Sequence, residues 1–275
     1  YSCGSFPKRG AHYAKKQIES WLKSDLKGTR YFGKMDIRHF YDSIRLDVLM
    51  RELSIRIKDE WFLYVIRLCL KGFKKGIPLG FYISQWLANY MLEPLDKLIT
   101  EGLGLRKLVR YMDDITIFAG NKKILHKAIA IIRAFLGRRF RLKLKDNYTV
   151  CKLIFEKAGR VRGRVLDFMG FLFYRTRTTI RKNIMLSATR LAKRMDKAKQ
   201  EGRGYYLKHV QAMLSYMGWF TCTDTYECYE EHIKPYVVIK KLKKIVSKMK
   251  RRQNHEGMVK GKMLRETGAV TAYCT

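Results

Sequence analysis

Three aspartates could do chemistry together in a chain dominated by cations. Asp113 and Asp114 are adjacent and lie between two hydrophobic, β-rich runs, within LVRYMDDITIF (108–118). Asp36 ends another β-rich run, RYFGKMDI (30–37). Oxygen ligands suit Mg²⁺, which usually takes one or two carboxylates and completes its shell with water and phosphate. If the three runs are neighbouring strands, the carboxylates converge on a site for phosphoryl or nucleotidyl transfer.

An Asp-Asp pair by itself is weak support for such a site, because aspartate is also favoured in solvated turns. The charge balance of the chain adds a second observation. The 275 residues include 58 Lys and Arg against 24 Asp and Glu, a net charge of +34. Such a field attracts a polyanion, of which nucleic acid is the commonest in a cytoplasm. An acidic protein or an anionic membrane surface is the alternative partner.

Composition bounds the class of protein. Hydrophobic residues make up 47% of the chain, enough for a packed core and too many for a disordered protein. No run of 18 apolar residues is present, so we expect no membrane span. Six scattered cysteines indicate reduced thiols and a cytoplasmic location. The sequence contains neither HExxH nor GxxxxGK[ST], which argues against zinc-protease and P-loop chemistry.

The hydrophobic pattern predicts the elements that position the aspartates. In chain order they are a helix at 11–23, a strand at 30–37, helices at 47–57 and 83–99, a hairpin at 108–118, a helix at 122–140, a strand at 141–145, a second hairpin at 165–182 and basic helices from about 184. Residues 30–150 therefore predict an α+β fold with a split β-α-β antiparallel sheet. In that sheet the first strand and the hairpin are neighbours.

Four motifs occur together, in order. YMDD (111–114), flanked by hydrophobic strands, resembles the signature of reverse transcriptases. GKMDIRHFYDSI (33–44) resembles their first palm motif, and GIPLGFYISQWLANYML (76–92) resembles the motif that supports the templating base and the incoming nucleotide. DFMGFLF (167–173) resembles the primer-grip hairpin. The resemblance implies a right-hand polymerase with fingers largely missing. Its expected parts are the end of the fingers (1–29), palm (30–164), primer-grip hairpin (165–183), helical thumb (184–252) and a loosely ordered tail (253–275).

The resemblance also implies roles for individual residues. Asp36, Asp113 and Asp114 would bind two Mg²⁺ ions, for which Mn²⁺ can substitute, with the backbone of Ile37 completing one shell. Tyr41 matches the steric gate that favours dNTPs over rNTPs; a core aromatic is the alternative. The other expected contacts are Leu79, Gly80, Ser84 and Gln85 with the nucleotide, and Tyr111, Met112, Phe168, Met169, Gly170, Lys240 and Lys244 with primer or template. The hairpin residues are equally compatible with a hairpin core, and the lysines with a solvated face.

Two positions depart from the common family pattern. Most reverse transcriptases carry Gln-Gly and then Ser-Pro in the second motif, whereas this chain has Leu79-Gly80 and then Ser84-Gln85. This resembles the reverse transcriptases of diversity-generating retroelements, which copy with errors, especially opposite template adenine; some antiphage defence enzymes depart here too. Tyr148 also replaces a lysine that is a candidate general acid, so Lys143 or Lys145 would have to substitute.

The resemblance implies RNA-directed DNA polymerase activity in a prokaryotic or phage-encoded protein. The expected partners are an RNA template, a DNA or RNA primer, dNTPs, a cognate structured RNA and a small accessory protein, with no membrane. A defence enzyme that uses a noncoding RNA is an alternative. A non-catalytic RNA-binding scaffold is a third reading, which the complete set of three aspartates disfavours.

Overall fold

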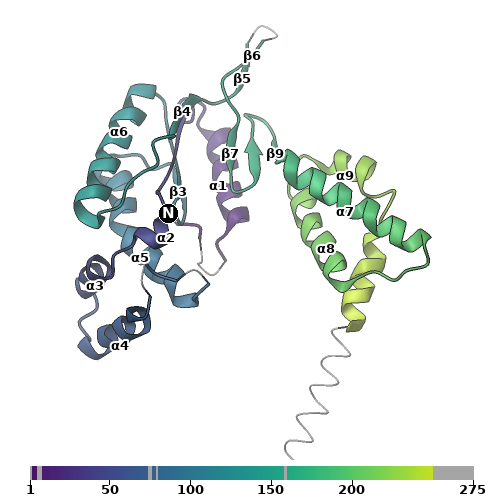
Figure 1. The fold of residues 1–275 in the computed structure, drawn as a ribbon. Coiled ribbons are helices and arrows are strands. Elements are labelled where there is room, and N and C mark those ends of the chain that lie inside the picture. The colour runs from purple at the N-terminus through teal and green to yellow at the C-terminus, as the bar shows by residue number, and fades with distance from the viewer. Residues whose placement is uncertain (1, 5–7, 74–75, 79, 158–159, 250–275) are drawn as a thin grey trace, which may run out of the picture. The chain divides into compact units, whose positions relative to one another are not determined.

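A computed structural model describes residues 2–4, 8–73, 76–78, 80–157 and 160–249. Leu79 and the expected tail (253–275) therefore lie outside the described residues. The chain divides into two compact units, Tyr1–Arg177 and Thr178–Thr275. The first contains α1 (Ala11–Ser24), β1 (Tyr31–Asp36), α2 (Phe40–Ser43), α3 (Leu46–Ser54), α4 (Glu60–Lys71), α5 (Tyr82–Lys97), η1 (Leu98–Gly102), β2 (Leu108–Tyr111), β3 (Asp114–Ala119), α6 (Lys122–Phe135), η2 (Leu136–Phe140), β4 (Thr149–Lys152), β5 (Phe155–Lys157), β6 (Arg160–Arg162), β7 (Leu166–Phe168) and β8 (Phe171–Phe173) (Figure 1).

The centre of the first unit is a four-stranded sheet in the order β2-β3-β1-β4. All its pairings are antiparallel, and β3 lies between β1 and its own hairpin partner β2. The predicted α+β class and the adjacency of the first strand to the hairpin are confirmed. Because β1 and β3 run in opposite directions, the end of β1 meets the start of β3.

Helices cover both faces of this sheet. Ile115 and Ile117 of β3 belong to the same core as Leu125 and Ile129 of α6. On the other face, Trp21 of α1 packs edge-on against Phe118. Strands that are covered on both sides are apolar throughout rather than alternating. This explains why five consecutive residues of β3 are buried.

The fourth strand lies later in the chain than the sequence pattern predicts. The expected strand at 141–145 is wrong: of its residues only Leu144 forms a β-bridge, an isolated one to Ile37, the residue that follows β1. Arg141 has a left-handed backbone (φ 58°) and ends η2. The residues that follow, 143–145, then pass the end of β1, where Lys145 N–H donates to the carbonyl oxygen of Asp36. The chain pairs along β1 only from Thr149 to Lys152.

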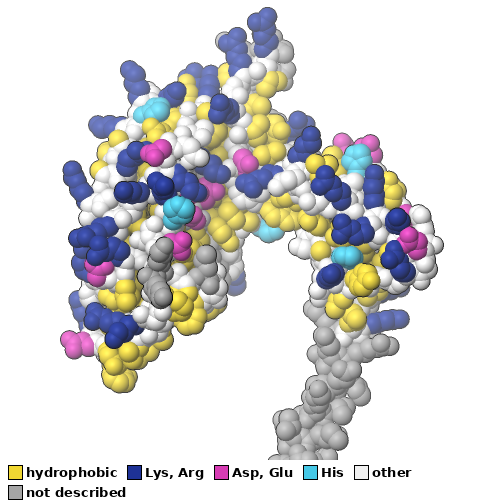
Figure 2. Space-filling model, viewed as in Figure 1, with side chains coloured by type: hydrophobic (Ala, Val, Ile, Leu, Met, Phe, Trp, Pro, Cys, Tyr) yellow, Lys and Arg dark blue, Asp and Glu magenta, His cyan; other side chains and the backbone are white. Residues whose placement is uncertain are grey.

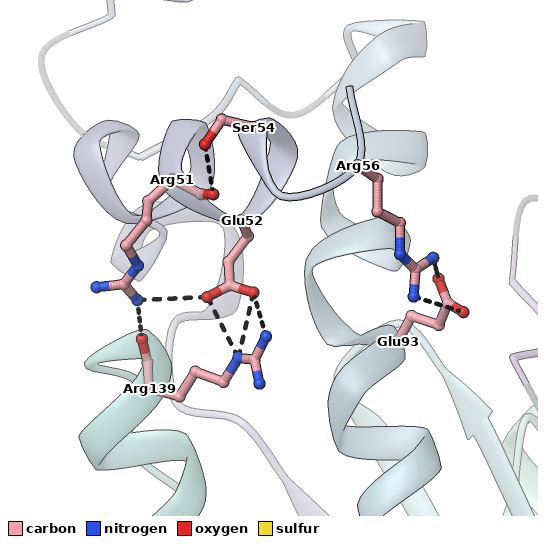
Figure 3. Close-up of polar contacts among 6 residues, drawn as sticks. All are labelled: Arg51, Glu52, Ser54, Arg56, Glu93 and Arg139. Atoms are coloured by element: carbon pink, nitrogen blue, oxygen red, sulfur yellow. Dashed lines mark hydrogen bonds and ion pairs between the residues drawn. The ribbon is translucent and has the colours of Figure 1, made fainter. Parts of the chain in front are cut away.

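A buried carboxylate anchors α3 to the rest of the first unit (Figure 3). Glu52 of α3 accepts three hydrogen bonds from Arg139 of η2, the shortest at 2.8 Å, and one from Arg51 at 3.3 Å. Arg51 also donates to the carbonyl oxygen of Arg139. Arg56, just after α3, pairs with Glu93 of α5. These contacts hold the segment that follows β1 against α5 and η2.

The second unit begins with β9 (Thr178–Ile180) and continues through α7 (Lys182–Gln200), α8 (Leu207–Thr221) and α9 (Tyr226–His232) to helical residues 239–249. Ala188 and Ala192 of α7 are fully buried with Val210 and Met213 of α8, so small side chains let these helices approach. Lysine and arginine side chains cover much of the visible surface (Figure 2). Lys240 and Lys244 are exposed on either side of the buried Leu242.

We predict that Glu52→Ala lowers the free energy of unfolding by about 2 kcal/mol, because two arginines lose a buried acceptor. The matched control is Asp47→Ala, which removes an ion pair to Arg45 whose side chains are 61% and 51% exposed. That change should leave the stability nearly unchanged, because water screens the exposed pair. Urea unfolding of both variants measures the difference, and equal effects would contradict the anchoring role of Glu52.

Candidate active site

The pairing of β1 with β3 brings the three predicted aspartates together. Asp36 is the last residue of β1 and stands directly opposite Asp114, the first residue of β3. Asp113 lies in the turn just before β3, and its carbonyl oxygen accepts a hydrogen bond from the backbone N–H of Ile37 at 3.3 Å. The convergence expected from the sequence is therefore present at one edge of the sheet.

Two lysines approach these carboxylates. Lys145 Nζ lies 2.8 Å from Asp36 Oδ1, and the backbone N–H of Lys145 donates to the carbonyl oxygen of Asp36 at 2.9 Å. Lys34 Nζ lies 3.3 Å from Asp114 Oδ2. Hydrogen bonding to Asp36 raises the pKa of Lys145, so its ammonium stays charged. Of the two candidate lysines, Lys145 rather than Lys143 carries its ammonium to the aspartates.

Burial dominates the electrostatics of the turn. It raises the pKa of Asp114 to about 6, with Lys34 opposing the shift and the other two aspartates adding to it. Burial, followed by the charge of Asp36, also raises the pKa of Asp113. Asp114 Oδ1 is buried and has no hydrogen-bond partner among the described residues. An oxygen in this state is a free ligand for a cation.

No group of three or more His, Cys, Asp or Glu side chains within the described part of the chain is arranged to hold a metal ion as it stands. The lysines explain this arrangement, because Asp36 and Asp114 each turn to a different ammonium group. The donor chemistry nevertheless fits magnesium: three carboxylates, of which Asp114 has a buried oxygen without a partner among the described residues, and the backbone carbonyl of Ile37 next to Asp36.

Tyr41, the expected steric gate, is half-buried on α2. Burial raises the pKa of its hydroxyl, and the charges of Asp113 and of ionised Tyr111 add to the shift. The segment at Gly76 packs against the backbone of Tyr41. The backbone N–H of Ile77, the next residue, donates to the carbonyl oxygen of Tyr41 at 3.0 Å. A Cβ on Gly76, whose φ is +57°, would collide with that carbonyl oxygen. The sequence reading missed Gly76, which is visible only as the first glycine of the second motif.

The other residues expected at the nucleotide surround the start of α5. Gly80 has a φ of +86°, a conformation that favours glycine, and a Cβ there would meet none of the described atoms within 4 Å. Ser84 is buried and its Oγ has no partner among the described residues, whereas Gln85 is exposed. Leu79 lies outside the described residues.

The expected primer contacts fall on two tight turns. Met112 is the buried first residue of the first turn, and Tyr111, which precedes it, is half-buried. Met169 and Gly170 form the turn between β7 and β8, with φ of 52° and 86°. Phe168 is fully buried, so its ring belongs to the core of the hairpin. Gly170 is also buried, so of these three hairpin residues only Met169 is partly exposed.

Lys34 connects the aspartates to this second hairpin, and the sequence reading overlooked it. Its Nζ donates to the carbonyl oxygen of Asp167 at 2.7 Å while facing Asp114. The sequence feature that could have indicated its role is its position two residues before Asp36, which puts both side chains on one face of a strand.

Comparison with known proteins identifies the family. The model of the reverse transcriptase (RNA-dependent DNA polymerase) family matches residues 6–171. The chain belongs to the reverse transcriptase family. This match includes the three aspartates, Tyr41 and the first hairpin residues. Among the described residues, no helix is long and apolar enough to cross a membrane.

The individual proteins that resemble this chain do so over part of their length or at low sequence identity. An uncharacterized 91 kDa protein in the cob intron of Schizosaccharomyces pombe is 34% identical over 108 residues, which are 36% of this chain and 13% of that protein. Apo telomerase from Candida tropicalis shares the fold at 12% identity and a TM-score of 0.51, over 88% of this chain and 48% of that chain. Telomerase from Candida albicans, in complex with a fragment of telomeric RNA, matches with a TM-score of 0.46 at 12% identity, over 80% of this chain and 44% of that chain. This reverse transcriptase chain thus spans less than half the length of each of these relatives.

The raised pKa of Asp114 gives a pH-dependent prediction in metal-free buffer. Because its folded pKa of about 6 lies above the value of 3.8 for an unburied aspartate, its contribution to stability is fully present below the unfolded pKa and is lost as pH rises through 6. Asp114→Asn mimics the neutral form. It should be more stable than wild type by on the order of 2 kcal/mol at pH 7.5, and the gain should vanish near pH 4.

Urea unfolding in EDTA at several pH values measures this difference. Asp146→Asn, at a side chain that is 88% exposed, is the control and should leave the pH profile unchanged. A gain for Asp114→Asn that is the same at all pH values would contradict the argument from burial.

Proposed function

We propose that this reverse transcriptase carries out RNA-directed DNA synthesis. In the proposed reaction the 3′-hydroxyl of a primer attacks the α-phosphorus of a dNTP, a new phosphodiester bond forms, and pyrophosphate leaves. The observation that carries the proposal is the register of β1 and β3, which sets Asp36 opposite Asp114 with Asp113 in the adjoining turn. The family match supports the same chemistry.

Asp36, Asp113, Asp114 and the backbone carbonyl of Ile37 are the proposed ligands of two Mg²⁺ or Mn²⁺ ions. When bound, the ions stabilise charge on the attacking and leaving oxygens. Lys34 and Lys145 neutralise the carboxylates in the structure described and would have to give up those contacts to the ions. Lys145 is then placed to hold a proton for the departing pyrophosphate.

The nucleotide would lie between Tyr41 and the start of α5. The ring of Tyr41, half-buried next to Asp113, would clash with a 2′-hydroxyl and so select dNTPs. The open space beside Gly80 would let the backbone approach the nucleotide. Leu79, Ser84 and Gln85 complete the proposed contacts on this side.

Primer and template contacts are proposed for the turns and for the basic helices. Tyr111 and Met112 would lie beneath the primer end, and the turn at Met169 and Gly170 would hold its backbone, resting on the buried Phe168. In the second unit, the exposed Lys240 and Lys244 would contact phosphates. Such contacts fix position and affinity without reading sequence.

For the subtype we propose an error-prone, retroelement-associated enzyme that works with a cognate structured RNA and a small accessory protein in a prokaryotic or phage-infected cytoplasm. Leu79 supports the error-prone subtype, since it stands where most reverse transcriptases have a glutamine, whose amide would lie beside the nascent base pair. The curated relative found in an intron also favours a retroelement over antiphage defence. Copying errors concentrated opposite template adenine would be the expected signature, whereas repetitive or untemplated products would favour a defence enzyme.

Primer extension tests the proposed reaction. Full-length protein with an RNA template, a DNA primer, dNTPs and Mg²⁺ should extend the primer, with the cognate RNA and accessory protein added if extension requires them. Asp113→Ala should reduce the rate on the order of a thousandfold, because a metal ligand is lost. Asp146→Ala, at an exposed aspartate, should extend normally. Wild-type protein that extends no primer even with these components would favour the non-catalytic scaffold.

A second prediction concerns the choice of sugar. Tyr41→Ala should raise rNTP incorporation relative to dNTP by on the order of a hundredfold, since the ring no longer blocks the 2′-hydroxyl. Single-nucleotide incorporation kinetics with matched dNTP and rNTP measure the ratio. Tyr64→Ala, at a tyrosine exposed on α4, is the control and should leave the ratio unchanged. An unchanged ratio in Tyr41→Ala would place the gate elsewhere.

A further inference from the structure

The turn that carries the aspartates has an unfavourable backbone. Met112, the first residue of the two-residue turn between β2 and β3, has a φ of 53°. Hairpin turns of this kind favour Gly, Asn or Asp where φ is positive. A residue with a long side chain keeps such a conformation only when its surroundings determine it. Something near Met112 must therefore hold the turn.

A buried arginine supplies that support. Arg110 is 1% exposed, and its guanidinium makes four hydrogen bonds. Two go to the carboxylate of Asp96 on α5, at 2.7 and 2.8 Å. Nη1 donates both to Asn89 Oδ1 and to the carbonyl oxygen of Met112, each at 3.1 Å. We call Arg110, Asp96 and Asn89 the arginine cluster.

Residues 2–4 complete the cluster from the other side. Ser2 Oγ donates to Asn89 Oδ1 at 2.9 Å, and Asn89 Nδ2 donates to the carbonyl oxygen of Gly4 at 2.8 Å. Cys3 N–H donates to the carbonyl oxygen of Arg110 at 2.7 Å. Gly4 also packs on the turn, since a Cβ there would lie 3.3 Å from both the backbone nitrogen and the Cε of Met112.

Stability alone does not account for a charged pair in this place. A buried ion pair gains little over well-packed apolar side chains of similar volume, because both charges lose their hydration. An apolar pair, however, could not donate a hydrogen bond to the carbonyl oxygen of Met112. That contact fixes the peptide group immediately before Asp113.

We propose that Arg110 is a positioning residue for the catalytic turn. It holds the carbonyl of Met112, and through it Asp113 and Asp114, while Asp96 and Asn89 fix the guanidinium and residues 2–4 close the cluster. The inference rests on the proposed function for its catalytic consequence. Its structural consequence, the order of the turn, stands independently of any activity.

The first test replaces the ion pair by apolar residues in the full chain, Arg110→Met with Asp96→Leu. We expect a folded protein in which kcat for primer extension falls by about tenfold to a hundredfold while KM for dNTP changes little, because the turn is misplaced and the nucleotide contacts remain. A folded double variant with wild-type kcat overturns the proposal.

The second test leaves the ion pair in place. Gly4→Ala pushes a methyl group against Met112, whereas Gly10→Ala, where a Cβ would have no described atom within 4 Å, is the matched control. Gly4→Ala should lower kcat several-fold and Gly10→Ala should not. Equal kcat in both would overturn the proposal even if the double variant fails to fold.

Hydrogen exchange separates this inference from the proposed function. The amide of Ile37, which donates to the carbonyl oxygen of Asp113, reports on the turn without any activity. It should exchange at least about tenfold faster in Gly4→Ala than in Gly10→Ala. Unchanged exchange counts against the arginine cluster. Faster exchange in a protein that never extends a primer would instead retain the cluster and reject the polymerase.

Discussion

The antiparallel register of β1 and β3 puts Asp36 and Asp114 directly opposite each other, and the arrangement of the candidate site follows from it. Like charges on opposite residues of two strands destabilise a sheet. The sheet keeps this pairing because the rest of both strands is apolar and covered by helices on each face. The repulsion is met locally by Lys34 and Lys145, and partly by the raised pKa of Asp114. The carboxylate cluster is thus an unfavourable arrangement that the core holds in place.

Unfavourable backbone conformations occur close to the aspartates in the chain. His39, Met112 and Arg141 all have left-handed backbones without being glycine. His39 follows β1, Met112 precedes Asp113, and Arg141 begins the segment that brings Lys145 to Asp36. Each therefore directs the chain at a point where a functional side chain must be aimed. Buried polar contacts such as the arginine cluster and the Glu52 anchor supply the rigidity that these conformations require.

Much of this arrangement could be predicted from sequence, because it follows from local patterns. Alternating and continuous apolar runs located β1, the β2–β3 hairpin, α5 and α6, and the three aspartates stood out as carboxylates within strands. The partners of those aspartates could not be found in the same way. Lys34 contacts Asp114 on the neighbouring strand, and the sequence offered Lys145 only as one of two candidates, because periodicity carries no information about contacts between distant segments. The contact of Gly76 with Tyr41 was missed for the same reason. The strand at 149–152 was misplaced because a single left-handed residue, Arg141, changes where pairing resumes.

If the three aspartates hold the divalent ions of the reaction, the protein must bind Mn²⁺ through them. The free ion can be followed by electron paramagnetic resonance while protein is added, with a chain-terminated primer on its template and the next dNTP present. Wild-type protein should remove Mn²⁺ beyond the amount taken up by nucleic acid and nucleotide alone. The Asp36→Asn/Asp114→Asn double variant, which keeps the side-chain volumes, should lose that excess. Equal Mn²⁺ uptake by wild type and double variant would contradict the account.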